Sequence, residues 1–160
     1  MIYDYFNTHV IGTLTLVADS EGLRHIGFES ARRPVPILSG WKHDAAFFKA
    51  AKNQLRAYFN GELQQFDLPL APLGTAFQQS VWRALRKIPY GAVVSYRWVA
   101  EQINNPKAVR AVGGANARNP LPIVVPCHRV IGSDGELTGF GGGLDVKQRL
   151  IELEKSKMPG

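Results

Sequence analysis

The chain has 160 residues, of which 45% are hydrophobic, so it is long enough to bury a core as one domain or as two small ones. Lysine and arginine outnumber aspartate and glutamate by 19 to 13, and the net charge of +6 suits a polyanionic partner. No apolar run approaches the roughly 20 residues that cross a bilayer, and the first residues lack the basic and apolar segments of a signal peptide. We therefore expect a cytoplasmic protein, or a nuclear one if the source is eukaryotic, that binds no membrane.

Cysteine and histidine are scarce in this chain. The only cysteine, Cys127, excludes an internal disulfide, and the four histidines do not combine with it in a zinc-binding spacing. We therefore expect no metal and no cofactor.

The first third of the chain has the pattern of strands. Residues 11–18 alternate and are rich in Val, Leu and Thr, and residues 22–28 follow a turn, so the two form a predicted hairpin of an antiparallel sheet. Residues 30–40 form a loop because of their prolines. Asp44 is expected to cap a helix that Gly61 ends, with its inward positions at Phe47, Ala51, Leu55 and Tyr58. Residues 66–70 are a further candidate strand, and the prolines around them place a domain boundary between residues 72 and 73.

Beyond Thr75 the hydrophobic period becomes helical. Residues 77–88 carry apolar side chains on one helical face, and the Pro-Tyr-Gly run at 89–91 ends that helix. Residues 95–103 form a short amphipathic helix, and residues 107–117 form a second one that begins at Pro106. Two short helices joined by a tight turn form a helix-turn-helix or an ordinary helical hairpin, and the pattern alone leaves both open.

The second of these short helices is thin. Ala108, Ala111 and the adjacent Gly113 and Gly114 leave little side-chain bulk, although each glycine costs roughly 1 kcal/mol in a helix interior. Such a cost indicates the close approach of another backbone, from DNA or from the neighbouring domain. Arg110 favours DNA, because an arginine can enter a groove and occupy space in the base stack.

The last part of the chain is a glycine-rich loop and a helix. Residues 138–143 are not a phosphate-binding loop, since no Gly-Lys-Ser/Thr follows them. Asp145 is expected to cap the final helix, which has Val146, Leu150 and Leu153 inward and Glu154 near its end.

The chemistry of the chain is expected at Cys127, which lies in the run Pro126-Cys127-His128-Arg129-Val130. A lone cysteine among apolar residues is most often a small buried hydrophobe. A thiol that attacks has to ionise, however, and an adjacent imidazole is its usual base. Because His128 and Arg129 are costly to bury unless they are paired, we interpret this segment as a candidate active site.

Residues 74–154 resemble the O6-alkylguanine-DNA alkyltransferases, the methylated-DNA-protein-cysteine S-methyltransferases that reverse alkylation damage. The matching segments, in order, are Phe77-Gln78 through Trp82, Ile88-Pro89-Tyr90-Gly91, Ser95-Tyr96, AVRAVGGA at 108–115, Asn119-Pro120, PCHRV at 126–130 and Gly142-Gly143-Leu144. The resemblance implies an α+β fold. A small ribonuclease H-like domain with an antiparallel sheet and a helix, residues 1–72, is followed by a mainly helical domain with a helix-turn-helix, residues 73–160.

The resemblance also implies the catalytic residues. Cys127 would accept the alkyl group, His128 would act on the thiol through a water as its base, and Glu154 would orient His128. Asn119 would brace the active-site turn, and Tyr96 would donate a proton or a hydrogen bond to the departing guanine.

Contacts with DNA are implied in the same way. Arg110 resembles the finger that fills the space left by a flipped base, and the other implied contacts are Tyr96, Ser95, Ala111, Gly113 and Arg129. The pocket for the base would be formed by Val125, Phe140, Gly141 and Tyr96. Some family members carry Tyr and Ser where this chain has Phe140 and Gly141, so those hydroxyl donors are missing here.

The implied function is DNA repair by direct reversal of damage. A monomer would bind double-stranded DNA through the minor groove, flip out O6-alkylguanine or O4-alkylthymine and transfer the alkyl group to Cys127. Because a thioether is very stable, each molecule would act once. Two alternatives are a protein that recognises alkylated bases without transfer, which usually lacks the cysteine, and a cysteine hydrolase, in which adjacent Cys and His are unusual.

Overall fold

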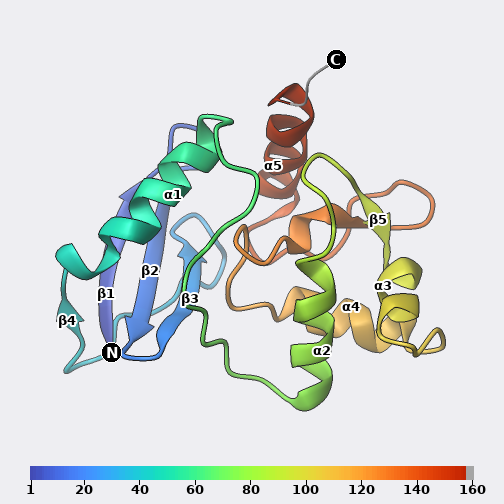
Figure 1. Cartoon of the computed structure of the whole chain (residues 1–160), viewed down its shortest axis with the longest axis horizontal. Helices are drawn as coiled ribbons and strands as arrows, with labels where there is room; N and C mark the ends of the chain where they lie inside the picture. Colours follow the sequence, from blue (N-terminus) through green and yellow to red (C-terminus); the bar gives the residue numbers. More distant parts are fainter. Residues whose placement is uncertain (158–160) are drawn as a thin grey trace.

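The structure, a computed structural model, describes residues 1–157. Figure 1 shows a sheet covered by a helix on one side of the molecule and a group of helices on the other. The elements in chain order are β1 (Ile2–Asn7), β2 (Thr13–Asp19), β3 (Gly22–Phe28), β4 (Lys42–His43), the 3-10 turn η1 (Ala46–Phe48), α1 (Lys49–Phe59), α2 (Ala76–Leu85), β5 (Val94–Ser95), α3 (Tyr96–Gln102), α4 (Val109–Ala117), the 3-10 turn η2 (Cys127–Arg129), β6 (Val130–Ile131) and α5 (Leu144–Lys157). The α+β class predicted from the sequence is confirmed.

The N-terminal sheet has the strand order β3-β2-β1-β4. The predicted hairpin of β2 and β3 is present, but β1 pairs with β4 in parallel, so the sheet is mixed and the prediction of a wholly antiparallel sheet is wrong in this detail. β1 was not predicted, because one of its buried positions is Asp4, which interrupts the apolar alternation. The carboxylate of Asp4 is satisfied by His43 and Lys52.

The helix predicted after Asp44 begins with a tighter turn than expected. Asp44 accepts a hydrogen bond from the backbone N–H of Phe47 of η1 at 3.1 Å, but the N-cap of η1 is Ala45 and that of α1 is Phe48, so Asp44 caps neither. The extra 3-10 turn changes the helical phase, and Phe48 is buried in place of the predicted Phe47, which is 48% exposed. Gly61, which was predicted to end this helix, follows α1 with a φ of +76°, a conformation that favours glycine at a helix end. Residues 66–70 form a single bridge between Leu70 and Leu23 and not a strand.

The C-terminal helices pack around α4, which contacts both α2 and α3. Thr75 and Gln78 form a capping box at the start of α2. The predicted helices are present with shorter bounds: α2 ends at Leu85, and α4 begins at Val109 because residues 106–107 form a turn. Asp145 lies in the first turn of α5 and does not precede the helix as a cap.

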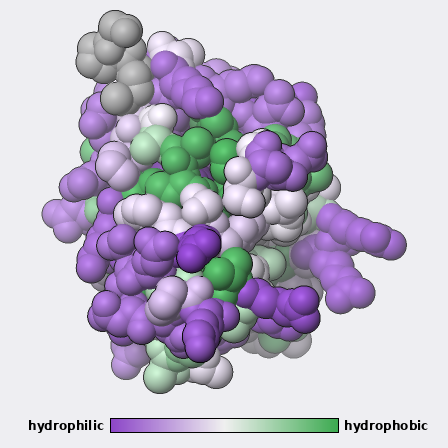
Figure 2. All heavy atoms as spheres, turned by 90° about the vertical axis from the view of Figure 1, so that its right-hand side faces the viewer, coloured by the Kyte–Doolittle hydropathy of each residue, from purple (hydrophilic) through white to green (hydrophobic). Residues whose placement is uncertain are grey.

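One hydrophobic core runs through both parts of the chain. Its buried residues include Leu14 and Leu16 of the sheet, Leu55 of α1, Val81 of α2 and Leu150 of α5. Within residues 1–157, no helix combines the length and apolarity that spanning a bilayer requires. Figure 2 views the molecule from the side that carries α3, where hydrophilic side chains surround smaller hydrophobic areas.

Candidate active site and DNA-binding face

The thiol of Cys127 is placed at the start of η2, in a segment where residues 121–130 are all buried. Its side chain is 4% exposed. Burial raises the pKa of this thiol to about 11, although a hydrogen bond from Asn119 and the charge of Lys147 act in the opposite direction. The thiol is therefore protonated at neutral pH, and it needs a base before it can attack a carbon atom.

His128 is the titratable residue that directly follows Cys127 in the chain. Its side chain is fully buried, and Nε2 lies 2.6 Å from Oε2 of Glu154. Burial lowers the pKa of His128, although Glu154 raises it, so the ring is neutral at pH 7 and Nε2 carries the proton that faces the carboxylate. Nδ1 has no hydrogen-bond partner among residues 1–157, which leaves its lone pair able to accept a proton.

Glu154 is the centre of a buried network of hydrogen bonds. Oε1 accepts from the backbone N–H of Gly91 and from Nε of Arg129, and Oε2 accepts from Tyr58, His128 and Nη2 of Arg129. Burial alone would raise the pKa of Glu154, but the hydrogen bonds and charges of His128 and Arg129 lower it to about 2. The carboxylate is therefore ionised over the whole physiological range and can stabilise an imidazolium.

The turn before the cysteine is held by asparagine side chains. Nδ2 of Asn119 donates to the carbonyl oxygen of Val125 at 2.8 Å, and its Oδ1 accepts from the backbone N–H of Leu121 at 3.0 Å. Asn116 is buried and donates to the carbonyl oxygen of Cys127 at 3.4 Å. Ile123 has a φ of +77°, a costly conformation for a β-branched residue, so this segment carries backbone strain next to the thiol.

A cavity of about 180 Å³ opens beside Cys127. Asn119, Phe140 and Gly141 line it from the C-terminal part of the chain, and Phe28 lines it from β3. The rings of Phe28 and Phe140 lie 5.5 Å apart, so the loop at 138–143 rests on the sheet and forms one wall. Phe140 and Gly141, both predicted for the base pocket, thus lie at the thiol, and Val125 contributes the backbone carbonyl held by Asn119.

Tyr96 connects the thin helix with the glycine-rich loop. Its hydroxyl lies 2.8 Å from the hydroxyl of Thr138, and a methyl group added at Gly113 would lie 3.9 Å from its ring. Lys147 of α5 fixes the same loop from within, because its buried ammonium donates to the carbonyl oxygens of Thr138 and Val130 at 2.7 and 2.5 Å.

The N-terminal half of α4 is exposed on the surface of the helical part of the chain. Arg110 and Ala111 are exposed, and Gly113 is half-buried against Tyr96. A Cβ at Gly113 would make only an ordinary contact with the protein, so packing within the chain does not require glycine there. Ser95 begins α3 as its N-cap, with its hydroxyl oxygen accepting from the backbone N–H of Trp98 at 3.0 Å.

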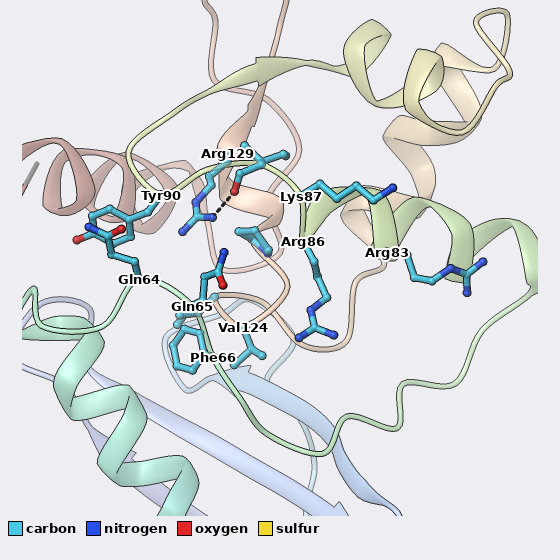
Figure 3. A pocket seen from close by; sticks show the side chains of 12 residues that line it. Gln64, Gln65, Phe66, Arg83, Arg86, Lys87, Tyr90, Val124 and Arg129 are labelled. Atoms are coloured by element: carbon cyan, nitrogen blue, oxygen red, sulfur yellow. Dashed lines mark hydrogen bonds between the residues drawn. The ribbon is translucent and has the colours of Figure 1, made fainter.

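Arg129, which was predicted to contact DNA, has partners inside the protein. Its side chain is buried at 5% exposure, donates through Nη1 to the carbonyl oxygen of Ile88 at 2.7 Å and binds both oxygens of Glu154. Figure 3 shows its guanidinium beside Tyr90, and the lining of the neighbouring cavity of about 400 Å³ includes Arg129 but not Cys127. Nε, Nη1 and Nη2 all donate within the protein, and the charge of Arg129 is paired with that of Glu154.

Three residues of the site have roles that the sequence analysis did not assign. Tyr58 was expected only as an inward helix position, yet a phenol on a buried face needs a hydrogen-bond partner, and its partner is Glu154. Lys147 stands at helical spacing with Leu150 and Glu154. A lysine on this buried face of the helix was the sequence feature that could have indicated its role. Asn116 had no signal, because nothing in its spacing distinguishes it from a solvated helix residue. Among residues 1–157, no group of three or more His, Cys, Asp or Glu could hold a metal ion.

Comparison with known sequence families covers almost the whole chain. Residues 1–72 match the family described as 6-O-methylguanine DNA methyltransferase, ribonuclease-like domain. Residues 76–156 match the family described as 6-O-methylguanine DNA methyltransferase, DNA binding domain.

Individual relatives are similar over their full length. A methylated-DNA-protein-cysteine methyltransferase of Methanosarcina acetivorans is 50% identical over 156 residues, which cover 98% of this chain and 99% of that protein. One of Mycobacterium tuberculosis is 50% identical over 149 residues, covering 93% and 90%. The crystal structure of Mycobacterium tuberculosis OGT in complex with DNA has a TM-score of 0.90 and 46% identity, covering 99% of this chain and 96% of that one. With matches of this extent in both halves, the chain belongs to the methylated-DNA-protein-cysteine methyltransferase family, the O6-alkylguanine-DNA alkyltransferases.

Proposed function

We propose that this methyltransferase repairs DNA by moving the alkyl group of O6-alkylguanine, or of O4-alkylthymine, to Cys127 in a single irreversible event. DNA repair by alkyl transfer is the activity of its family, and DNA is its partner. The observation that carries the proposal for Cys127 is that its buried thiol is followed by His128, which is hydrogen-bonded to Glu154. The raised pKa of the thiol means that it needs such a base to ionise.

The proposed reaction is an in-line displacement at the alkyl carbon. The thiol of Cys127 loses its proton through a water to Nδ1 of His128, and Glu154 stabilises the imidazolium that forms. The sulfur then forms a bond with the alkyl carbon while the bond from that carbon to O6 breaks, and the electron pair stays on the guanine. Tyr96 donates a hydrogen bond or a proton to the guanine anion, and the proton held by His128 returns through water to the base or to Tyr96, so the final products are neutral guanine and a thioether.

The base would be held in the cavity beside Cys127. Asn119 supports the turn that presents the thiol, and the backbone around Val125 and the wall of Phe140 and Gly141 surround the base. Because the thiol lies in a buried segment, a base inside a duplex has to leave the stack to reach it, at a cost of about a few kcal/mol.

DNA would approach along the face of α3 and α4. The exposed Arg110 is suited to enter the minor groove and fill the space of the flipped base, and the open surface at Ala111 and Gly113 allows a close phosphate. Ser95 and Tyr96 stand at the start of α3, beside this face. We further propose that the protein acts as a monomer of two domains, 1–72 and 73–160, a division supported by the ends of the two family matches.

The test is mass spectrometry of the intact protein and its peptides after mixing with an equal concentration of duplex DNA that contains one O6-methylguanine. We expect one added methyl group per chain, located on the peptide of Cys127, and none in the Cys127→Ser variant, which should bind the same DNA with nearly unchanged affinity.

Two outcomes would contradict the proposal, each in favour of another function. An unchanged mass with tight binding of the methylated duplex would support recognition without transfer. Repeated turnover of a small ester or peptide that depends on Cys127 would support a hydrolase.

A further inference from the structure

Tyr58 brings the N-terminal part of the chain into the buried network of the active site. It lies on α1, its side chain is completely buried, and its hydroxyl donates to Oε2 of Glu154 at 2.5 Å across 96 positions of sequence. The other groups that donate to this carboxylate among the described residues are Gly91, His128 and Arg129. Among the described residues, Tyr58 is thus the donor to Glu154 that lies in the N-terminal part of the chain, before residue 73.

Tyr58 and His128 bind the same oxygen of Glu154, Oε2. Oε2 accepts from Tyr58, from His128 at 2.6 Å and from Nη2 of Arg129 at 3.0 Å. A carboxylate oxygen has two lone pairs, so three donors compete for its electron density. Each of them weakens the pull of that oxygen on the other two.

The Tyr58 hydroxyl keeps its proton throughout the physiological range. Burial raises the pKa of Tyr58 well above its ordinary value, and the charge of Glu154 acts in the same direction. Tyr58 is therefore a permanent donor to Glu154, whereas His128 changes its charge during the reaction.

We propose that Tyr58 is a positioning residue for alkyl transfer, which holds Glu154 in place and limits how strongly this carboxylate draws a proton onto His128. The proposal rests on the roles of His128 and Glu154 given above. It assigns the N-terminal part of the chain a function in the chemistry, in addition to its contribution to the core.

The consequence concerns the pKa of His128, which Glu154 must not raise too far. If Glu154 attracted the ring too strongly, His128 would already be an imidazolium at neutral pH and could not accept the thiol proton. With the Tyr58 hydroxyl in place, the negative charge of Glu154 is shared, and the ring stays neutral until the thiol gives up its proton. Removal of the hydroxyl should raise the pKa of His128.

The experiment is a pH profile of methyl transfer in single-turnover conditions, from a duplex with one O6-methylguanine to the full chain and to Tyr58→Phe. We expect the acid limb of the Tyr58→Phe profile to move to higher pH by about 0.5 to 1 unit, because a hydrogen bond to a charged group is lost. The rate should fall several-fold on that limb and be retained at high pH.

The chain offers a matched control in Tyr90. Its ring centroid lies 6.1 Å from that of Tyr58, its hydroxyl is also buried, and that hydroxyl has no hydrogen-bond partner among residues 1–157. Tyr90→Phe should therefore reproduce the profile of the unchanged protein. A second variant with 3-fluorotyrosine at position 58 keeps the shape of the side chain and strengthens the donor, so its acid limb should move to lower pH.

The protonation of His128 is read independently from the NMR signals of its ring nitrogens during the same titration. A rate lowered equally at every pH in Tyr58→Phe, with an unmoved His128 titration, would reduce Tyr58 to a structural role and overturn the proposal. A profile that is unchanged in both Tyr58 variants would also overturn it. If His128→Ala instead kept the full rate, the proposed role of His128 would fail first, which separates the two conclusions.

Discussion

At the scale of single residues, the property that defines the site is the weak acidity of Cys127. Burial keeps its thiol neutral, so the nucleophile exists only after a proton has moved to another group. This arrangement protects the thiol from solution reagents while the site is empty of substrate, because such reagents attack the thiolate.

The raised pKa of Cys127 makes the stability of the protein depend on pH. The thiol has a pKa of 9.0 in the unfolded chain and about 11 in the folded one, so its contribution to stability is complete below pH 9 and is lost as the pH rises through 11. We expect the free energy of unfolding of the unchanged protein, measured against Cys127→Ala by denaturant titration, to decline by roughly 1.4 kcal/mol per pH unit in this window. If the free energies of unfolding of the two proteins changed with pH in parallel, the raised pKa of Cys127 would be contradicted.

Residue types near the cysteine could be identified from the sequence, but their partners could not. Cys127, His128 and Asn119 lie within nine positions, so a local motif was enough to bring them to one site. Arg129 was assigned to DNA from the family resemblance alone. Its real partner, Glu154, is 25 positions away and buried, and the sequence contains no measure of that contact.

At the scale of elements, α4 keeps a glycine, Gly113, that its own packing does not require. Gly113 could accommodate a methyl group at 3.9 Å from the ring of Tyr96, and alanine is favoured over glycine in a helix by about 1 kcal/mol. The close approach of DNA proposed above would account for this glycine.

The variant Gly113→Ala should separate stability from DNA binding. We expect its free energy of unfolding to rise by up to about 1 kcal/mol and its affinity for undamaged duplex, measured by fluorescence anisotropy, to fall by about tenfold. Asn53→Ala is the control, since Asn53 is exposed on α1 and a better helix former there should stabilise the protein without changing DNA affinity. Unchanged binding by Gly113→Ala would remove the close phosphate from the proposal.

Elements were predicted well where one periodicity was uninterrupted. The hairpin of β2 and β3 and the helices α2 to α5 follow clear periods of two and 3.6 residues. The errors arose where a tertiary contact broke the period: the buried Asp4 concealed β1, and the 3-10 turn before α1 exchanged Phe47 for Phe48. A two-residue strand such as β4 has no periodicity at all, so its parallel pairing could not be predicted.

At the scale of the whole molecule, Glu154 joins segments that are far apart in the sequence. Its carboxylate binds α1 through Tyr58, the turn after α2 through Gly91, and η2 through His128 and Arg129. The same buried group therefore serves the proposed chemistry and the packing of both halves of the chain (Figure 1).

The substitution Arg129→Met tests this double use. Removal of one partner leaves the carboxylate of Glu154 buried with fewer donors, and we expect the free energy of unfolding to fall by about 3–5 kcal/mol. The salt dependence of DNA affinity, measured for the folded protein, should keep its slope, because Arg129 is buried and paired with Glu154. A slope lower by about 1 would restore Arg129 as a DNA contact.

The single cysteine of the chain has a practical consequence. Since Cys127 is the only thiol and the proposed product is a thioether, an unfolded sample titrated with a thiol reagent reports the fraction of molecules that have not yet reacted. No second sulfhydryl adds a background to that reading. A purified population would therefore carry a chemical record of the alkylation it has met, and this record could be read without any DNA.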